Sequence, residues 1–198
     1  MTGDLLPLVF TSGWASGVNA YATVLLLGLL GRFAGVDAVP AGLERTDVLV
    51  AAAVLYAVEF VADKIPYVDS TWDAVHTAIR PTVGAVIGLL VAGDADSLET
   101  AVLSATGGVT ALVSHLVKTG LRLAVNTSPE PASNIAVSVA EDFSVAGLIA
   151  LVVAAPWVAA GIALVLLLTG VLLVVLLASR IRRGLRRRRA QRSTAQPG

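Results

Sequence analysis

The sequence predicts an all-α, polytopic membrane protein, and three observations lead to that prediction. Of the 198 residues, 56% are hydrophobic and only 14% are charged, and the mean hydropathy is +0.82. Leu, Val and Ala gather in long runs, and a helix of about 20 apolar residues crosses a hydrocarbon core about 30 Å thick. An arginine cluster follows the last run directly. This composition excludes a disordered chain and argues against a soluble domain.

Six apolar stretches are expected to form about six transmembrane helices. The third, Pro81–Ala92, is too short to cross alone, so we expect it to take Asp73–Arg80 as polar first turns rather than to re-enter the membrane. One helix over Phe143–Ala178 would be about 54 Å long, and Pro156 predicts that the chain turns back there. The expected spans are Leu5–Leu30, Val48–Ile65, Pro81–Ala92 with those first turns, Leu98–Leu123, Ile135–Ala155 and Val158–Leu177.

Three of these stretches contain residues that interrupt an apolar helix. Thr11–Tyr21 is rich in Ser, Gly and Asn, Gly107 and Gly108 lie in the fourth stretch, and Glu141 and Asp142 lie near the start of the fifth. Backbone groups freed by a break inside the membrane must meet protein, water or a ligand. The polar residues of the first stretch favour a lined cavity, whereas the glycines of the fourth favour close helix packing.

Charge is unevenly distributed along a chain whose formal net charge is zero. Residues 180–198 hold eight of the fourteen basic residues, and such clusters mark cytoplasmic flanks. We therefore expect a cytoplasmic tail rather than a nucleic-acid-binding segment, and six spans would put the N-terminus in the cytoplasm as well. The predicted protein is a multi-pass protein of the bacterial inner membrane with residues 1–179 as its helical domain. The absence of cysteine excludes disulfides and thiolate chemistry.

Residues 1–93 and 97–179 are compatible with two three-helix repeats. Gly17-Val18-Asn19-Ala20 aligns with Gly108-Val109-Thr110-Ala111, and each half carries an acid inside its second span. Because three spans per half reverse the direction of entry, such repeats would be inverted, as in many transporters. The alternative is a chance match between segments rich in Gly and Ala.

Acidic residues inside the expected spans are the first candidates for function. Glu59 and Asp63 are four residues apart and share a helix face, and a carboxylate at the bilayer centre costs at least about 2.5 kcal/mol on insertion scales. Glu59 could carry a proton or, with Glu141, form part of a cation site. Alternatively, Glu59 bonds to a neighbouring helix, and Asp63 and Lys64 reach the interface.

A polar stripe is expected before Pro81. Asp69, Asp73, His76 and Arg80 are spaced so that a helix places them on one face. The two carboxylates and the imidazole could bind a divalent ion. Against a metal site, Arg80 is placed to neutralise Asp73, and such a stripe is often a solvated face.

Several motifs occur together between Phe10 and about Leu151. They are Ser12-Gly13, Ser16-Gly17-Val18-Asn19-Ala20-Tyr21, Glu59-Phe60-Val61-Ala62-Asp63-Lys64-Ile65-Pro66, Asp69-Ser70, Trp72-Asp73, His76 and Arg80-Pro81. In combination they resemble the bacterial membrane family named domain of unknown function 4126. The resemblance implies a small multi-span membrane protein and assigns no activity and no catalytic residue.

Our leading hypothesis is a small secondary transporter or channel for a cation or small polar solute, with no enzymatic activity and no cofactor. The alternative is a non-transporting structural, scaffolding or lipid-handling protein whose acids form internal salt bridges. Expected partners are the lipid bilayer, the solute and, because the helical body is small, a second copy of the chain. The residues expected to line the path are Ser12, Ser16, Asn19, Tyr21, Glu59, Asp63, Asp73, His76, Arg80, Glu141 and Asp142.

Overall fold

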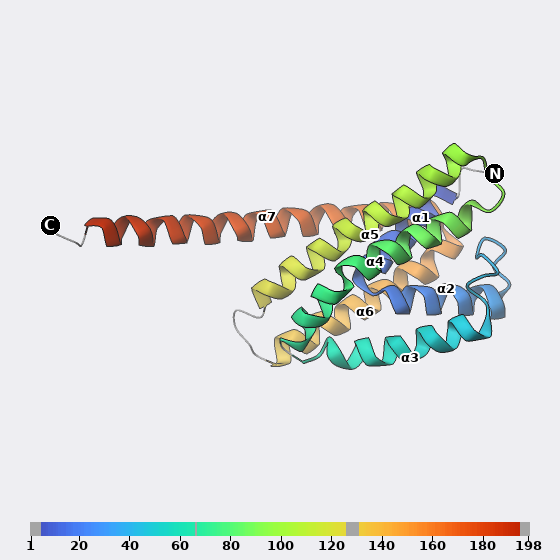
Figure 1. Cartoon of the computed structure of the whole chain (residues 1–198), viewed down its shortest axis with the longest axis horizontal. Helices are drawn as coiled ribbons and strands as arrows, with labels where there is room; N and C mark the ends of the chain where they lie inside the picture. The colour runs from blue at the N-terminus through green and yellow to red at the C-terminus, as the bar shows by residue number, and fades with distance from the viewer. Residues whose placement is uncertain (1–4, 66, 126–130, 195–198) are drawn as a thin grey trace.

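A computed structural model describes residues 5–65, 67–125 and 131–194, and within these ranges the chain is entirely helical apart from its connections (Figure 1). This confirms the predicted all-α class. The helices are α1 (Leu5–Val18), α2 (Ala20–Ala34), α3 (Thr46–Ala62), α4 (Val68–Ala92), α5 (Ser97–Val125), α6 (Pro131–Ala154) and α7 (Pro156–Thr194).

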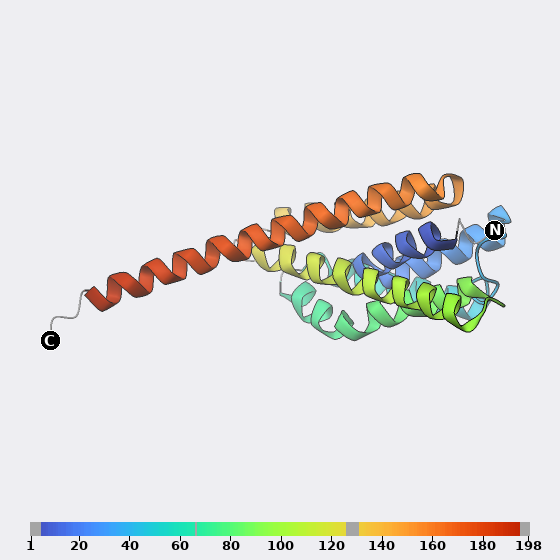
Figure 2. The same ribbon diagram turned by 90° about the horizontal axis from the view of Figure 1, so that it is seen from above.

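The long helices agree with the expected spans. Within the described residues, α4, α5, α6 and α7 are each long and apolar enough to cross a membrane. The third span does take polar first turns, since α4 begins at Val68 and continues through Pro81. The turn at Pro156 is also present, because α6 ends at Ala154 and α7 begins at Pro156. Helix α7 then continues beyond the body of the bundle to Thr194 (Figure 2).

The first apolar stretch differs from the expected single span. It breaks at Asn19, whose extended backbone (φ −150°, ψ 100°) and side-chain bond to the amide of Ala22 start a new helix. The chain reverses there, so α1 and α2 form a helical hairpin with both open ends at one end of the bundle (Figure 1). At 14 and 15 residues, each arm is about 21 to 23 Å long, less than a hydrocarbon core of about 30 Å.

This hairpin changes the relation between the two ends of the chain. Leu6 at the start of α1 and Trp157 at the start of α7 line the same surface hollow, and α7 runs from there to the other end of the bundle (Figures 1 and 2). The described ends therefore lie at opposite ends of the bundle. The sequence predicted both termini on the same side of the membrane because it predicted six membrane-spanning helices. A hairpin replaces the first of these helices, so that prediction no longer follows.

The glycines of the fourth stretch serve close packing and do not interrupt the helix, because α5 is continuous from Ser97 to Val125. A Cβ on Gly13 would lie 2.7 Å from the carbonyl oxygen of Gly107, and one on Gly84 would lie 2.6 Å from the same oxygen. Only glycine allows backbones this close. The interruption expected at Glu141 is likewise absent, since α6 is continuous through it.

The aligned tetrapeptides do not occupy equivalent places in the structure. One forms the tip of the hairpin, and the other lies inside the continuous α5. Gly13 lies against Gly107 and Gly17 against Ala111, so α1 and α5 run parallel and side by side. Inverted repeats would make these helices antiparallel, so this arrangement does not support the expected inverted repeats.

Burial follows the pattern of a membrane protein. Large apolar side chains such as Val165, Leu168 and Leu172 on α7 are exposed, whereas Glu59 and Arg80 are completely buried. Apolar core residues, including Trp14, Leu27 and Ile149, pack around the hairpin. The bundle therefore turns a hydrocarbon-like surface outward and keeps its charges inside, which is favourable in lipid.

Candidate functional site

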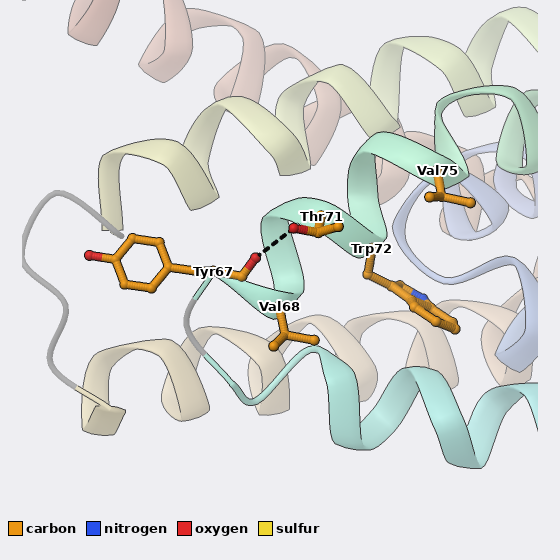
Figure 3. Close-up of a pocket in the computed structure, with 5 residues that line it drawn as sticks. All are labelled: Tyr67, Val68, Thr71, Trp72 and Val75. Atoms are coloured by element: carbon orange, nitrogen blue, oxygen red, sulfur yellow. Dashed lines mark hydrogen bonds between the residues drawn. The ribbon is translucent and has the colours of Figure 1, made fainter.

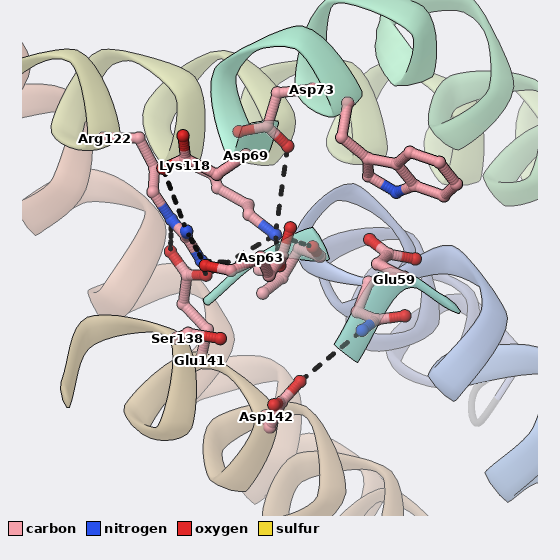
Figure 4. A network of polar contacts seen from close by, with 12 residues as sticks. Glu59, Asp63, Asp69, Asp73, Lys118, Arg122, Ser138, Glu141 and Asp142 are labelled. Atoms are coloured by element: carbon pink, nitrogen blue, oxygen red, sulfur yellow. Dashed lines mark hydrogen bonds and ion pairs between the residues drawn. The ribbon is translucent and has the colours of Figure 1, made fainter. Parts of the chain in front are cut away.

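Ten charged side chains meet inside the bundle and form what we call the charge cluster (Figure 4). Each takes part in at least one ion pair of 3.9 Å or less with another member. They come from α3 and its C-terminal residues, α4, α5 and α6. The members are Glu59, Asp63, Lys64, Asp69, Asp73, Arg80, Lys118, Arg122, Glu141 and Asp142.

Arg80 joins α3 to α4 at the end of the cluster nearest the hairpin. Its guanidinium lies 2.6 Å from Glu59 Oε1 and 2.9 Å from Asp73 Oδ1, and all three side chains are fully buried. It also donates to the backbone oxygen of Gly17 at 3.4 Å. Because Gly17 lies in the last turn of α1, the cation is placed where it stabilises a helix C-terminus.

Lys118 connects the hairpin tip to the acids. Its ammonium lies 2.7 Å from Asp63 Oδ2, 3.5 Å from Glu141 Oε2 and 2.9 Å from the carbonyl oxygen of Val18. The break after Val18 frees that carbonyl from the helical ladder. The backbone carbonyl groups at the break in the first apolar stretch are therefore bound by cationic side chains of the protein. The sequence had favoured a cavity lined by polar residues at this place.

Arg122 holds the far end of the cluster together. It pairs with Glu141 Oε2 at 2.6 Å and with Asp69 Oδ2 at 3.3 Å, and it donates to the backbone oxygen of Asp63 at 2.7 Å. Asn134 donates to the same oxygen at 3.2 Å. Since Asp63 directly follows α3, Arg122 caps the C-terminus of this helix and pairs it with α6.

The last pair lies at the edge of the cluster. Lys64 contacts Asp142 Oδ2 at 3.4 Å and Ser138 at 3.3 Å, and it lies 3.2 Å above the ring centre of Phe60. Asn19 reaches the other Asp142 oxygen at 3.5 Å. The hairpin tip thus touches the cluster through a side chain as well as through backbone carbonyls.

The cluster contains more acids than bases. Its six carboxylates face four cations, so its formal charge is −2 when every member is ionised. Four carboxylate oxygens, on Glu59 (Oε2), Asp63 (Oδ1) and Asp73 (both oxygens), are buried without a hydrogen-bond donor, although Asp73 Oδ1 forms an ion pair with Arg80. An uncompensated charge in such an interior is costly, and these oxygens are free to accept a proton or a cation.

Two histidines border the cluster, and His115 does so as a neutral ring. His115 Nδ1 lies 2.9 Å from an Arg80 nitrogen, which can only donate, so this ring nitrogen is the acceptor and carries no proton. His76 Nδ1 lies 2.7 Å from the carbonyl oxygen of Trp72, which can only accept, so Nδ1 carries a proton, and Nε2 lies 3.0 Å from the Tyr21 hydroxyl. His76 is also stacked on Trp72.

The structure brings most of the predicted path residues together. Ser16 donates to the backbone oxygen of Arg80 at 3.0 Å, whereas the Ser12 hydroxyl is buried without a partner and contacts no cluster residue by a hydrogen bond. The predicted residues found in the cluster or bonded to its members are Ser16, Asn19, Glu59, Asp63, Asp73, Arg80, Glu141 and Asp142, with Tyr21 joined to His76 beside them.

The polar stripe of α4 points into the bundle. Asp69, Asp73, His76 and Arg80 are all buried, so this is not a solvated face. Among the described residues, no group of three or more His, Asp or Glu side chains has the geometry of a metal site. Arg80 instead forms an ion pair with Asp73 and neutralises it. This is the alternative to a metal site that the sequence analysis raised.

Sequence reasoning gave too little weight to the cations of α5. Lys118 and Arg122 make six ion pairs between them and are nearly fully buried. Their spacing carried a signal, because His115, Lys118 and Arg122 recur at i, i+3 and i+7 and so share a helix face. Asn134 and Ser138 on α6 carried no comparable signal.

A separate hollow lies on the surface of α4, with a volume of about 410 Å³ (Figure 3). Tyr67, Val68, Thr71, Trp72 and Val75 line it, and none of them is charged. Tyr67 precedes α4 with a positive φ of 70°. This hollow offers apolar contact and no cluster residue lines it.

An outward apolar surface around a buried charge cluster defines an integral membrane protein of the helical, polytopic class. The model of the family described as domain of unknown function (DUF4126) matches residues 6–176. The chain belongs to this family, which confirms the resemblance seen in the motifs. No curated protein and no solved structure matches the chain.

Proposed function

We propose that the protein moves a proton or a small cation across the membrane, with the charge cluster as the site that takes up and releases positive charge. The observation that carries the proposal is the excess of two carboxylates among the ten charges of the cluster, seven of which are buried. A structural salt-bridge network needs only matched charges. Two surplus acids need two further positive charges from protons or bound ions, because the interior cannot hold them unbalanced.

Glu59 is the acid to which we assign the exchange. One of its oxygens is held by Arg80 at 2.6 Å, and the other has no hydrogen-bond donor although the side chain is fully buried. A proton or cation on the second oxygen leaves the Arg80 pair intact. Glu59 can therefore change its charge without dismantling the cluster.

The hairpin forms one boundary of the cluster. Its tip contributes backbone oxygens to Arg80 and Lys118 and the side chain of Asn19 to Asp142. With the arginine-rich end of α7 in the cytoplasm, the open end of the hairpin faces the opposite side. A small displacement of the tip would expose the cluster to that side.

A non-transporting structural role is the second candidate. It is favoured by the finding that each of the four bases of the cluster, Lys64, Arg80, Lys118 and Arg122, pairs with at least one acid. In that role the acids would fasten α3, α4, α5 and α6 together. It does not account for the two surplus carboxylates.

Flux into proteoliposomes tests the proposal. Vesicles with an internal pH dye receive imposed Na⁺ and K⁺ gradients, and the wild type is compared with Glu59→Gln. We expect wild-type flux and a loss of at least about tenfold in the variant, because glutamine keeps the acceptor for Arg80 but cannot exchange charge.

Glu99→Gln is the matched control, since it makes the same chemical change in an acid outside the cluster. It should retain wild-type flux. Thermal unfolding in detergent checks that both variants fold. Absence of flux in the wild type, or equal flux in the wild type and Glu59→Gln, would contradict the proposal and favour the structural role.

A further inference from the structure

A hollow of about 310 Å³ lies beside the cluster between α5, α6 and α7, and residues near the C-terminal end of α1 also line it. This volume is at the lower end of the range for sites that bind small organic molecules. Most of the lining is apolar and includes Trp14, Leu166 and Leu173, but Lys118 and Glu141 of the cluster also line it. It is therefore an amphipathic site with one charged wall.

The apolar part of the hollow faces the lipid side of the bundle. Leu166 and Leu173 both belong to α7 and are exposed, and α7 is the most apolar of the candidate spans. A molecule entering between these residues would come from the hydrocarbon region. The occupant must accordingly carry an apolar part that dissolves in lipid.

The charged wall offers a carboxylate rather than a cation. The Glu141 side chain is 17% exposed, whereas those of Lys118 and Arg122 are 2% and 1% exposed. Lys118 makes its shortest contacts with Asp63 at 2.7 Å and with the carbonyl oxygen of Val18 at 2.9 Å, and its ammonium lies 3.5 Å from Glu141 Oε2. Since the cluster as a whole also has a formal charge of −2, a positive group is the complementary one here.

We infer that this hollow binds a lipophilic organic cation of the alkylammonium class. Its ammonium group lies beside Glu141, and its alkyl part lies against Trp14 and the side chains of α7. This inference rests on the proposed function in one respect, because the alkylammonium ion would be the positive charge that the cluster takes up and releases. The cation reaches the cluster sideways from the bilayer, without an aqueous path through the bundle.

Quenching of Trp14 fluorescence tests this site in the full chain in a neutral maltoside detergent. Trp72→Phe and Trp157→Phe make Trp14 the sole reporter among the three tryptophans. The probes are a bromoalkyl trimethylammonium ion, a bromoalkyl sulfonate and a bromoalkanol of equal chain length. We expect saturable quenching by the cation and at least about tenfold weaker binding of the other two.

Two substitutions locate the site. Ala140→Phe fills the hollow and should abolish the saturable quenching, whereas Ala136→Phe, one turn earlier on α6 and outside the lining, should preserve it. Glu141→Gln should remove the preference for the cation. Gel filtration confirms that each variant is folded, so loss of binding in Ala140→Phe alone is not a folding defect.

Three outcomes would overturn the inference. These are equal binding of the cation and the alcohol, quenching that survives Ala140→Phe, and a cation preference that survives Glu141→Gln in a folded protein. Binding and flux are measured separately. Flux without alkylammonium binding would leave the proposed function standing without this site, and binding without flux would leave the site standing alone.

Discussion

Replacing Arg80 by methionine removes the cation between two fully buried acids, Glu59 at 2.6 Å and Asp73 at 2.9 Å. The formal charge of the cluster falls from −2 to −3. Breaking a buried ion pair from one side costs about 3 to 5 kcal/mol, because the remaining charge is left uncompensated. We expect Arg80→Met to lower the free energy of unfolding by that amount.

Combination with Glu59→Gln should restore part of this loss. Glutamine removes one of the two uncompensated charges, so the double variant should be more stable than the sum of the single effects predicts, by at least about 1 kcal/mol. Reversible unfolding in mixed micelles of maltoside and dodecyl sulfate gives the four free energies of this cycle. Effects that add to within about 0.5 kcal/mol would refute the coupling.

The matched control is the pair of Arg45 and Asp47. Its atoms lie 2.7 Å apart, as close as the buried pairs, but the side chains are 67% and 66% exposed. Exposed pairs contribute little because water and salt screen them. Arg45→Met should leave stability unchanged within error, and an Arg80→Met effect of the same size would mean that burial does not govern the cluster.

Three further predictions concern the hairpin and its packing. Gly107→Ala should destabilise the protein by about 1 to 3 kcal/mol because its Cβ would overlap the backbone of Gly84, whereas Gly147→Ala, with no atom within 4 Å, should be neutral or stabilising in the same unfolding assay. Asn19→Ala should cost about 1 kcal/mol through loss of the N-cap of α2, and unchanged stability would mean that the cap is dispensable. The chain has no native cysteine, so a membrane-impermeant maleimide should label Leu6→Cys from the side opposite to Arg183→Cys; labelling of both from one side would contradict the hairpin.

The helical membrane class could be predicted because hydrophobicity and segment length are properties of the sequence alone. The turn at Pro156 and the polar start of α4 followed from the same arithmetic of length. The break near Asn19 was also predictable, since Ser, Gly and Asn weaken an apolar helix. Hydropathy does not tell whether the chain continues or reverses after a break. That choice is set by long-range packing, because Gly13 and Gly17 press α1 against α5.

The site was predicted in part for a similar reason. Charged residues in apolar segments are conspicuous, so Glu59, Asp63 and Arg80 were found. Which charge pairs with which depends on how four helices meet, and the sequence does not contain those contacts. Lys118 illustrates this, because its main partners, Asp63 and the carbonyl oxygen of Val18, lie 55 and 100 positions away.

Infrared spectroscopy of the carboxyl groups tests the central claim that the cluster lacks two positive charges. At neutral pH in a buffer without small metal cations, we predict a carbonyl band of protonated carboxylic acid that weakens when Na⁺ or an alkylammonium ion is added. The band should be reduced in Glu59→Gln and unchanged in Glu99→Gln. If the protein shows no such band and no response to added cations, the six carboxylates of the charge cluster are all ionised, and this result would contradict the account.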